Sequence, residues 1–135
     1  MYGLAKRLRN SLGYYLACLM FHAFPLPQRE AGTKDALRYM GELLGEGWSV
    51  VIFPEGRHAE GDEVAAFQPG VGMMAARLGA RVVPVRLRGV HRVLHREARM
   101  ATPGRVEVAF GRALELRGTD YAALAREIEE GVKKL

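Results

Sequence analysis

Hydrophobic residues follow two patterns along this chain: helical spacing in some stretches and short continuous runs in others. Apolar side chains three and four positions apart are typical of amphipathic helices, whereas short apolar runs rich in valine and isoleucine are typical of strands. In the last stretch the apolar residues Tyr121, Leu124, Ile128 and Val132 share one face, which predicts that this face lies inward. We expect helices over residues 2–22, 69–78 and 120–134, and a helix that Thr33 could cap and that Gly45 and Gly47 end. We expect strands over 48–53, 82–87 and 105–110.

The predicted strand over 48–53 contains the run Val50 to Phe53, which has no polar side chain. Such a run is typical of a strand buried on both faces. A helix and a second strand follow it, which is the order of a βαβ unit with a right-handed crossover. We therefore expect an α/β fold with a mixed, largely parallel sheet and flanking helices, formed by residues 1–135 as a single domain.

The chain has 135 residues, a formal charge of +5 and one cysteine, Cys18. A single cysteine excludes a disulfide within the chain and suits a reducing compartment. Arginine binds phosphate and carboxylate groups through two donors at once, so the many arginines favour anionic partners such as phospholipid head groups or nucleotide-bearing thioesters. The densest basic stretch, residues 86–99, either meets such a partner or forms a solvated surface. It lacks the interleaved aromatic residues and the motifs of nucleic-acid-binding proteins, so we predict no nucleic-acid partner.

The N-terminal stretch places basic residues 6–9 before the apolar run 12–21, as signal peptides do, but no small-x-small cleavage site follows. The apolar run is also shorter than the ~20 residues that cross a bilayer. Two interpretations stay open. The stretch is a helix packed on the core, or a helix in the membrane interface with its basic end toward anionic lipid.

An acid, a glycine and two basic residues follow the predicted strand, in the order Pro54-Glu55-Gly56-Arg57-His58. Open α/β proteins place ligand sites where strands end. Gly56 can adopt a positive φ and expose backbone N–H groups to a phosphate, and Arg57 offers a fork of donors. The alternative is a tight turn with a surface Glu–Arg pair. No grouping of cysteine and histidine in the sequence indicates a metal site.

Two further patterns carry little weight. The run Gly70-x-Gly72-x-x-Ala75 matches a dinucleotide fingerprint, but no strand directly precedes it and the next strand ends in Arg86-Leu87-Arg88 rather than in an acid. His58 and Glu63 lie on a polar loop that fixes no catalytic geometry.

Four blocks of the sequence resemble those of the glycerolipid acyltransferases, the lysophosphatidate or phospholipid-glycerol acyltransferase family. In this family a short strand ends in a phosphate-binding arginine, and Phe24-Pro25-Leu26-Pro27-Gln28-Arg29 is similar to it. The family usually has Thr-Arg where this chain has Arg57-His58, and lysine where it has Gln68. The other blocks are Phe53-Pro54-Glu55-Gly56, Phe67-Gln68-Pro69-Gly70 and Val82-Val83-Pro84-Val85, and the resemblance covers residues 20–112.

The resemblance implies transfer of a fatty acyl group from acyl-CoA or acyl-carrier protein to a hydroxyl of a lysophospholipid or glycerol phosphate. The acyl thioester is then a substrate, and no cofactor is implied. An anionic membrane surface is the implied partner, and the implied location is cytoplasmic, peripheral on the inner face of the membrane. The residues implied to bind substrate are Arg29, Pro54, Glu55, Gly56, Arg57 and His58.

The catalytic motif of that family, His-x-x-x-x-Asp before the arginine strand, is missing from this sequence. In the family its histidine deprotonates the acceptor hydroxyl, and its aspartate orients the histidine. We therefore assign no catalytic residue, and we expect negligible turnover and a glycerol-3-phosphate acyltransferase-like fold that is N-terminally incomplete. The alternative is a non-catalytic module that binds lipid or membrane surfaces. At the motif's spacing, His22 is followed by Pro27, His58 by Glu63, His91 by Arg96 and His95 by Met100.

Overall fold

The computed structural model describes residues 19–20, 33–56, 61–93 and 102–135. The chain divides into two compact units, residues 1–38 and 39–135. In the first unit Leu19 and Met20 are helical and exposed. The rest of the helix predicted over 2–22 lies outside the described residues. Helix α2 (Thr33–Gly45) begins in the first unit and ends in the second. It ends at Gly45 as predicted, and Thr33, the predicted cap, is its first residue.

The second unit contains the other two predicted long helices, α3 (Pro69–Leu78) and α5 (Tyr121–Lys133). Pro69 occupies the first turn of α3, where a missing N–H is harmless, and Gly79 ends the helix in the left-handed conformation with φ 58°. Asp120 caps α5, because its side chain accepts a hydrogen bond from the Ala123 backbone N–H at 3.0 Å. A short helix, α4 (Val90–Val93), lies between the predicted strands 82–87 and 105–110.

The described strands form two small antiparallel sheets. Strand β1 (Arg81–Val82) pairs with β4 (Leu114–Glu115), and β2 (Val85–Arg88) pairs with β3 (Glu107–Phe110). The predicted strand 82–87 is therefore divided in two, because Pro84 has no N–H to donate to a ladder. The Pro84 carbonyl still accepts a hydrogen bond from Gly111 N–H at 2.8 Å. Helices and strands are both present as predicted, and the parallel pairing stays a prediction.

The prediction of a doubly buried strand over 48–53 is wrong for the described part of the chain. The segment has no strand assignment there, and the Val51 and Phe53 side chains are 80% and 75% exposed. An apolar strand is buried only when neighbouring strands or helices cover its faces, and no described strand pairs with this segment. The sequence run shows that the segment favours an apolar environment, but it does not show what covers it.

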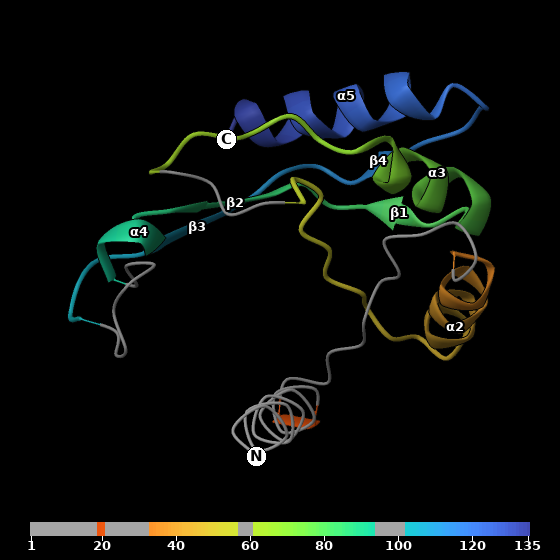
Figure 1. Cartoon of the computed structure of the whole chain (residues 1–135), viewed down its shortest axis with the longest axis horizontal. Coiled ribbons are helices and arrows are strands. Elements are labelled where there is room, and N and C mark those ends of the chain that lie inside the picture. Colours follow the sequence, from red (N-terminus) through yellow and green to blue (C-terminus); the bar gives the residue numbers. More distant parts are fainter. Residues whose placement is uncertain (1–18, 21–32, 57–60, 94–101) are drawn as a thin grey trace, which may run out of the picture. The chain divides into compact units, whose positions relative to one another are not determined.

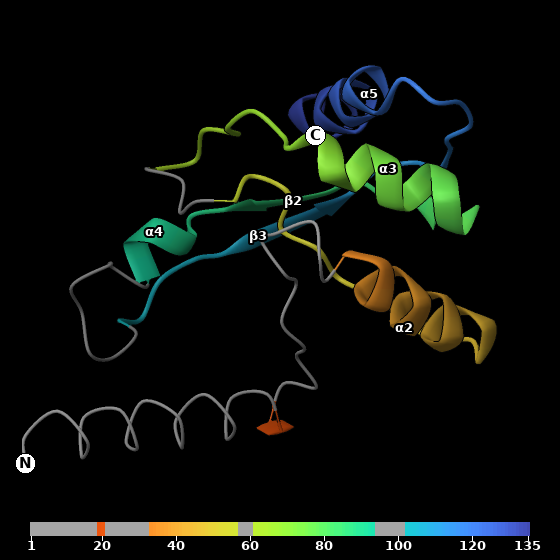
Figure 2. The same ribbon diagram turned by 45° about the vertical axis from the view of Figure 1, so that its right-hand side comes forward.

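The core of the second unit lies between α3 and α5, which pack against each other (Figures 1 and 2). Gly72 is the closest point of approach, since a Cβ placed there would lie 2.3 Å from the Tyr121 carbonyl oxygen. Of the α5 residues predicted to face inward, Leu124, Ile128 and Val132 are buried and Tyr121 is partly buried, which confirms the prediction. The buried cluster consists of Val71, Ala75, Leu116, Leu124, Ala125 and Ile128.

The β2–β3 ladder has two chemically different faces, because neighbouring residues of a strand point in opposite directions. The register pairs Val85 with Phe110 and Leu87 with Val108, and all four of these apolar side chains are at least 40% exposed. The other face carries Arg86 and Arg88, whose guanidinium groups donate to backbone carbonyls at the end of the chain, those of Lys133 and Leu135. One face of this ladder thus carries arginines that contact the end of the chain, and the other face is apolar and exposed.

Candidate functional site

The turn that follows segment 48–53 has the conformation expected from its sequence. Residues 54–56 form a turn or bend, and Gly56 has φ +65°. The Pro54 carbonyl accepts a hydrogen bond from Gln68 N–H at 2.9 Å, and the Glu55 Oε2 atom accepts one from Ala65 N–H at 3.0 Å. These two bonds hold the turn against the returning segment 65–68. One carboxylate oxygen of Glu55 therefore stabilises the fold.

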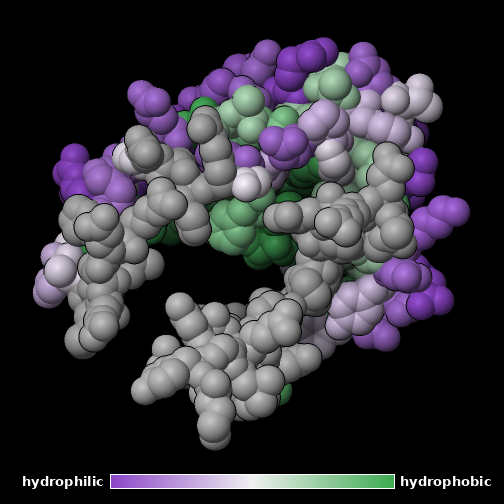
Figure 3. All heavy atoms as spheres, viewed as in Figure 1, coloured by the Kyte–Doolittle hydropathy of each residue, from purple (hydrophilic) through white to green (hydrophobic). Residues whose placement is uncertain are grey.

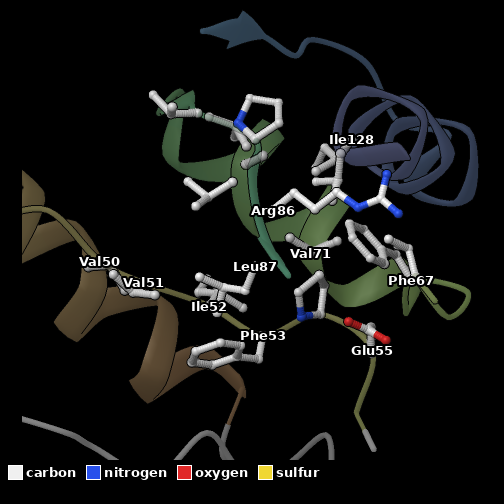
Figure 4. Close-up of a pocket in the computed structure, with 18 of the residues that line it drawn as sticks. Val50, Val51, Ile52, Phe53, Glu55, Phe67, Val71, Arg86, Leu87 and Ile128 are labelled. Atoms are coloured by element: carbon white, nitrogen blue, oxygen red, sulfur yellow. The ribbon is translucent and has the colours of Figure 1, made fainter. Parts of the chain in front are cut away.

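A large, mainly apolar groove of about 1380 Å³ borders this turn. One part of its wall is the segment from Ser49 to Glu55, and another is the exposed face of β2 with Val85 and Leu87. Figure 3 shows hydrophobic residues gathered in the middle of the view. In the close-up, Phe53 and Leu87 belong to different parts of this wall, and Arg86 extends toward α5 (Figure 4).

Polar side chains on the groove wall come from the segment 61–63 and from the region around α4. Asp62 and His91 both line the groove, and their side chains meet through Asp62 Oδ1 and His91 Nδ1 at 3.2 Å. The same Asp62 oxygen accepts a hydrogen bond from Gly89 N–H at 2.7 Å. This backbone bond, followed by the neighbouring His91 and Arg92, lowers the pKa of Asp62 below its ordinary value of 3.8 against an opposing effect of desolvation.

This Asp–His pair was missed by the sequence analysis because its members lie 29 residues apart. The family motif joins residues at a fixed spacing of five, whereas this pair comes from different segments. The only sequence signal was the loop glycine Gly89, whose φ of +77° turns the chain into α4. That signal indicates a special backbone conformation and does not name a partner.

A second carboxylate, Glu129 on α5, fixes the segment that leads into α3. Its Oε2 atom accepts a hydrogen bond from Phe67 N–H at 3.0 Å, and its Oε1 atom pairs with Lys133. The bond with Lys133, followed by that with Phe67, lowers the pKa of Glu129 below its ordinary value of 4.5. Glu129 thus connects α5 to the groove residue Phe67.

The basic stretch 86–99 is not a uniform cationic surface. Arg86 donates to the Lys133 carbonyl at 3.1 Å and to the Asp62 carbonyl at 3.4 Å, and Arg88 donates to the Leu135 carbonyl at 2.7 Å. Both arginines therefore hold the C-terminal end of α5 against the sheet. Residues 94–101 of this stretch lie outside the described residues.

The structure brings together half of the residues implied to bind substrate. Pro54 and Glu55 line the groove, and Gly56 continues the same turn. The other three residues, Arg29, Arg57 and His58, lie outside the described part of the chain. The His58–Glu63 pair therefore cannot be described either.

The described residues contain neither a metal-binding cluster nor a membrane-spanning helix. These residues contain no group of three or more histidine, cysteine, aspartate or glutamate side chains placed to hold a metal ion. No helix among them is long and apolar enough to cross a membrane.

A sequence model described as Acyltransferase matches residues 5–88. This match covers more than half of the chain, and the chain therefore belongs to the acyltransferase family. The matched region includes the turn at 54–56, the groove segment before it and strand β2. No solved structure matches the chain significantly.

Three curated relatives carry the name 1-acyl-sn-glycerol-3-phosphate acyltransferase. The chloroplastic protein LPAT1 of Arabidopsis thaliana is 33% identical over 79 residues, which are 58% of this chain and 22% of that protein. The chloroplastic protein BAT2 of Brassica napus is 32% identical over 79 residues, covering 58% and 23%. A protein of Chlamydomonas reinhardtii is 34% identical over 80 residues, covering 58% and 24%. The chain thus spans less than a quarter of the length of these relatives.

Proposed function

We propose that this domain binds a glycerol-phosphate lipid in the groove and takes part in acyl transfer to its free hydroxyl. The observation that carries the proposal is an exposed apolar groove that ends at the family's Phe-Pro-Glu-Gly turn. The relatives' shared name supports a 1-acyl-sn-glycerol-3-phosphate as the acceptor. Acyl-CoA or acyl-carrier protein is the proposed donor.

The acyl chain of the lipid occupies the apolar walls of the groove in this proposal. Val51 and Phe53 are 80% and 75% exposed, so their apolar surface faces water when the groove is empty. Covering apolar surface is favourable by roughly 25 cal/mol per Å², and acyl chains supply such surface along their whole length. Binding pockets commonly combine apolar walls with a few polar groups that set the orientation, and Glu55 is such a group here.

The phosphate lies at the turn 54–56 in this proposal. A glycine with positive φ presents backbone N–H groups in a concave arrangement that suits anions, and Gly56 has this conformation. By resemblance, Arg29, Arg57 and His58 supply further donors to the phosphate. Glu55 Oε2 is held by Ala65 N–H, and we assign Oε1 to the acceptor hydroxyl.

The wider setting follows from the same resemblance. Residues 1–135 act as one acyltransferase domain with a largely parallel sheet in this proposal. The domain works at an anionic membrane surface on the cytoplasmic side, where its lipid substrate is found. Exposed Arg92 and the residues around it supply positive charge for this contact.

Calorimetric titration of the 135-residue chain with lysophosphatidate tests the proposal, and monoacylglycerol with the same acyl chain is the matched ligand without phosphate. We expect lysophosphatidate to bind more tightly than monoacylglycerol. Phe53→Ser should weaken both ligands, whereas Val106→Ser should weaken neither, because Val106 is exposed outside the groove lining. Equal affinity for the two ligands contradicts the phosphate assignment, and the absence of binding by either contradicts the whole proposal.

The alternative function is a non-catalytic module that binds lipid or membrane surfaces. This alternative needs no His-x-x-x-x-Asp motif, and the given sequence contains none. Both functions share the binding step, and they differ in whether phosphatidate is formed from lysophosphatidate and a thioester. Co-sedimentation with anionic vesicles that weakens with salt, together with no product formation, would select the alternative.

A further inference from the structure

Helix α4 and the segment 102–105 lie together at the end of the β2–β3 ladder where β2 finishes and β3 begins (Figures 1 and 2). They pack against each other, because Thr102 N–H donates to the Val93 carbonyl at 2.7 Å. Gly89 is close to the same segment, since a Cβ placed there would lie 2.4 Å from the Arg105 carbonyl oxygen. We call this part of the molecule the α4 end; it consists of residues 88–93 and 102–107.

Helix α4 lies at the rim of the groove. Its first two residues, Val90 and His91, line the groove, whereas the next residue, Arg92, is exposed and does not belong to the lining. Val85 and Leu87 of the preceding strand line the same groove. The α4 end therefore has apolar side chains along the groove and positive charge just outside it.

The carboxylates at the α4 end are already engaged by neighbouring groups. Glu107 forms an ion pair with Arg88 at 4.0 Å. Asp62, which lies against this end, accepts a hydrogen bond from Gly89 N–H at 2.7 Å, and the same oxygen lies 3.2 Å from His91 Nδ1. These two acids are thus satisfied by partners other than the exposed arginines.

Two arginines at the α4 end have no such partner. Arg92 and Arg105 are exposed, and neither side chain forms an ion pair or a hydrogen bond within the described part of the chain. Exposed Glu63 on the groove wall carries one opposing charge. The guanidinium donors of both arginines remain available, and such donors bind phosphate through two parallel N–H···O bonds.

We propose that the α4 end holds the phosphate groups of the carrier that brings the acyl thioester to the groove. The inference rests on the proposed function, which places the acceptor phosphate at the turn 54–56 and requires a second substrate in the same groove. Both proposed donors carry their acyl group on phosphopantetheine, so each has a phosphate on the carrier side of the thioester. The phosphate contacts Arg92 and Arg105, and the pantetheine chain passes Val90 into the groove.

An anionic membrane surface presents the same phosphate chemistry and is the competing source. The proposed function uses the charge around Arg92 for membrane contact, so the two sources have to be separated by experiment. The position of α4 favours the thioester carrier, because Val90 and His91 line the groove directly before Arg92 in the sequence. A flat lipid surface needs positive charge but no connection to the groove.

Calorimetric titration of the 135-residue chain with coenzyme A tests the inference, and pantetheine is the matched probe without phosphate. We expect coenzyme A to bind more tightly than pantetheine and to lose affinity as salt is added. Arg92→Gln and Arg105→Gln should each weaken coenzyme A by about fivefold, the upper end of exposed ion-pair effects, and leave pantetheine unchanged. Arg112→Gln is the matched control, because Arg112 is an exposed arginine beyond the other end of β3.

The melting temperature of each variant should stay near that of the native chain, because the exchanged side chains are exposed. Coenzyme A that binds no more tightly than pantetheine, or does not bind, overturns the inference. A loss of affinity in Arg112→Gln equal to that in Arg92→Gln also overturns it, since the attraction would then come from net charge alone.

Vesicles and lysophosphatidate separate this inference from the other proposals. If the variant with both Arg92→Gln and Arg105→Gln retains coenzyme A but no longer co-sediments with anionic vesicles, the α4 end contacts membrane and the inference is wrong. Lysophosphatidate affinity should be unchanged in this variant. Native chain that binds coenzyme A through the two arginines but binds no lysophosphatidate supports the site at the α4 end and contradicts the proposed acceptor site.

Discussion

The α3–α5 interface and the groove are built from similar apolar residues, yet only the first is closed. In the interface Ile128 and Ala125 are 3% and 2% exposed, and Gly72 allows backbone contact between the helices. Along the groove Val51 and Phe53 remain mostly exposed. Composition therefore does not separate the two regions, and the difference lies in whether a partner surface is present in the unit.

This difference indicates which residues stabilise the fold and which are available to bind a ligand. Side chains in the closed interface are packed against neighbours on all sides, so their substitution changes the free energy of unfolding. Groove side chains have fewer contacts to lose, so their substitution should change ligand affinity instead. The carboxylates of Glu129 and Asp62 differ in the same way. Glu129 accepts a hydrogen bond from Phe67 N–H and so connects α5 to the fold, whereas Asp62 contacts His91 on the groove wall.

The largest expected effect is at the closed interface. Gly72→Ala should lower the free energy of unfolding by about 3 kcal/mol, the upper end of overpacking effects, since the added Cβ would overlap the Tyr121 carbonyl. Gly70→Ala is the matched control, because its Cβ would meet only Met74 Cε at 3.9 Å. Urea unfolding followed by circular dichroism measures both variants. Equal stability of the two would show that the helices can separate freely at Gly72.

Removal of methyl groups should have a smaller effect on stability, and this effect should differ between the interface and the groove. Ile128→Val should destabilise the chain by about 1 kcal/mol, because a buried methyl group is removed. Val51→Ala removes two methyl groups from an 80% exposed side chain and should change stability by less than about 0.5 kcal/mol. Thermal melts of both variants make the comparison. A larger loss for Val51→Ala would mean that segment 48–53 is covered in solution.

The smallest effect concerns Glu129 and depends on pH. Glu129→Gln keeps an acceptor for Phe67 N–H but loses the charge pair with Lys133, a change of about 0.5 kcal/mol. The folded-state pKa of Glu129 lies below its ordinary value of 4.5, so its contribution is complete above pH 4.5 and is lost as the pH falls through the lowered pKa. The difference in melting temperature between the native chain and the variant should therefore vanish in acid. A difference that persists there would assign the effect to packing.

Local structure was largely predictable from the sequence. The helix at 69–78 has the predicted bounds, α2 is present close to its predicted ends, and α5 lies within the predicted 120–134. Their periodicity and their end signals at Pro69, Gly79 and Asp120 act within a few residues, so no distant partner is needed to interpret them. The Phe-Pro-Glu-Gly turn was predictable for the same reason, including the positive φ of Gly56.

The strands were predicted less well because pairing is not a local property. The apolar run at 48–53 indicated burial, yet the segment is exposed and unpaired within the described residues. Pro84 divides the second predicted strand, and each half pairs with a different partner, β4 or β3. Arg86 and Arg88 belong to the dense basic stretch 86–99, but the twofold alternation of β2 turns both toward the end of the chain at Lys133 and Leu135.

By itself the sequence determined the helices and the family blocks, because these depend on residues that are close together along the chain. Only the tertiary structure decided that α3 and α5 meet at Gly72 and that the apolar segment 48–53 borders an open groove. It also decided that Asp62 contacts His91, which lies 29 residues away in the sequence. Contacts between residues that are distant in the sequence depend on how the elements pack, and a motif of fixed spacing contains no information on that packing.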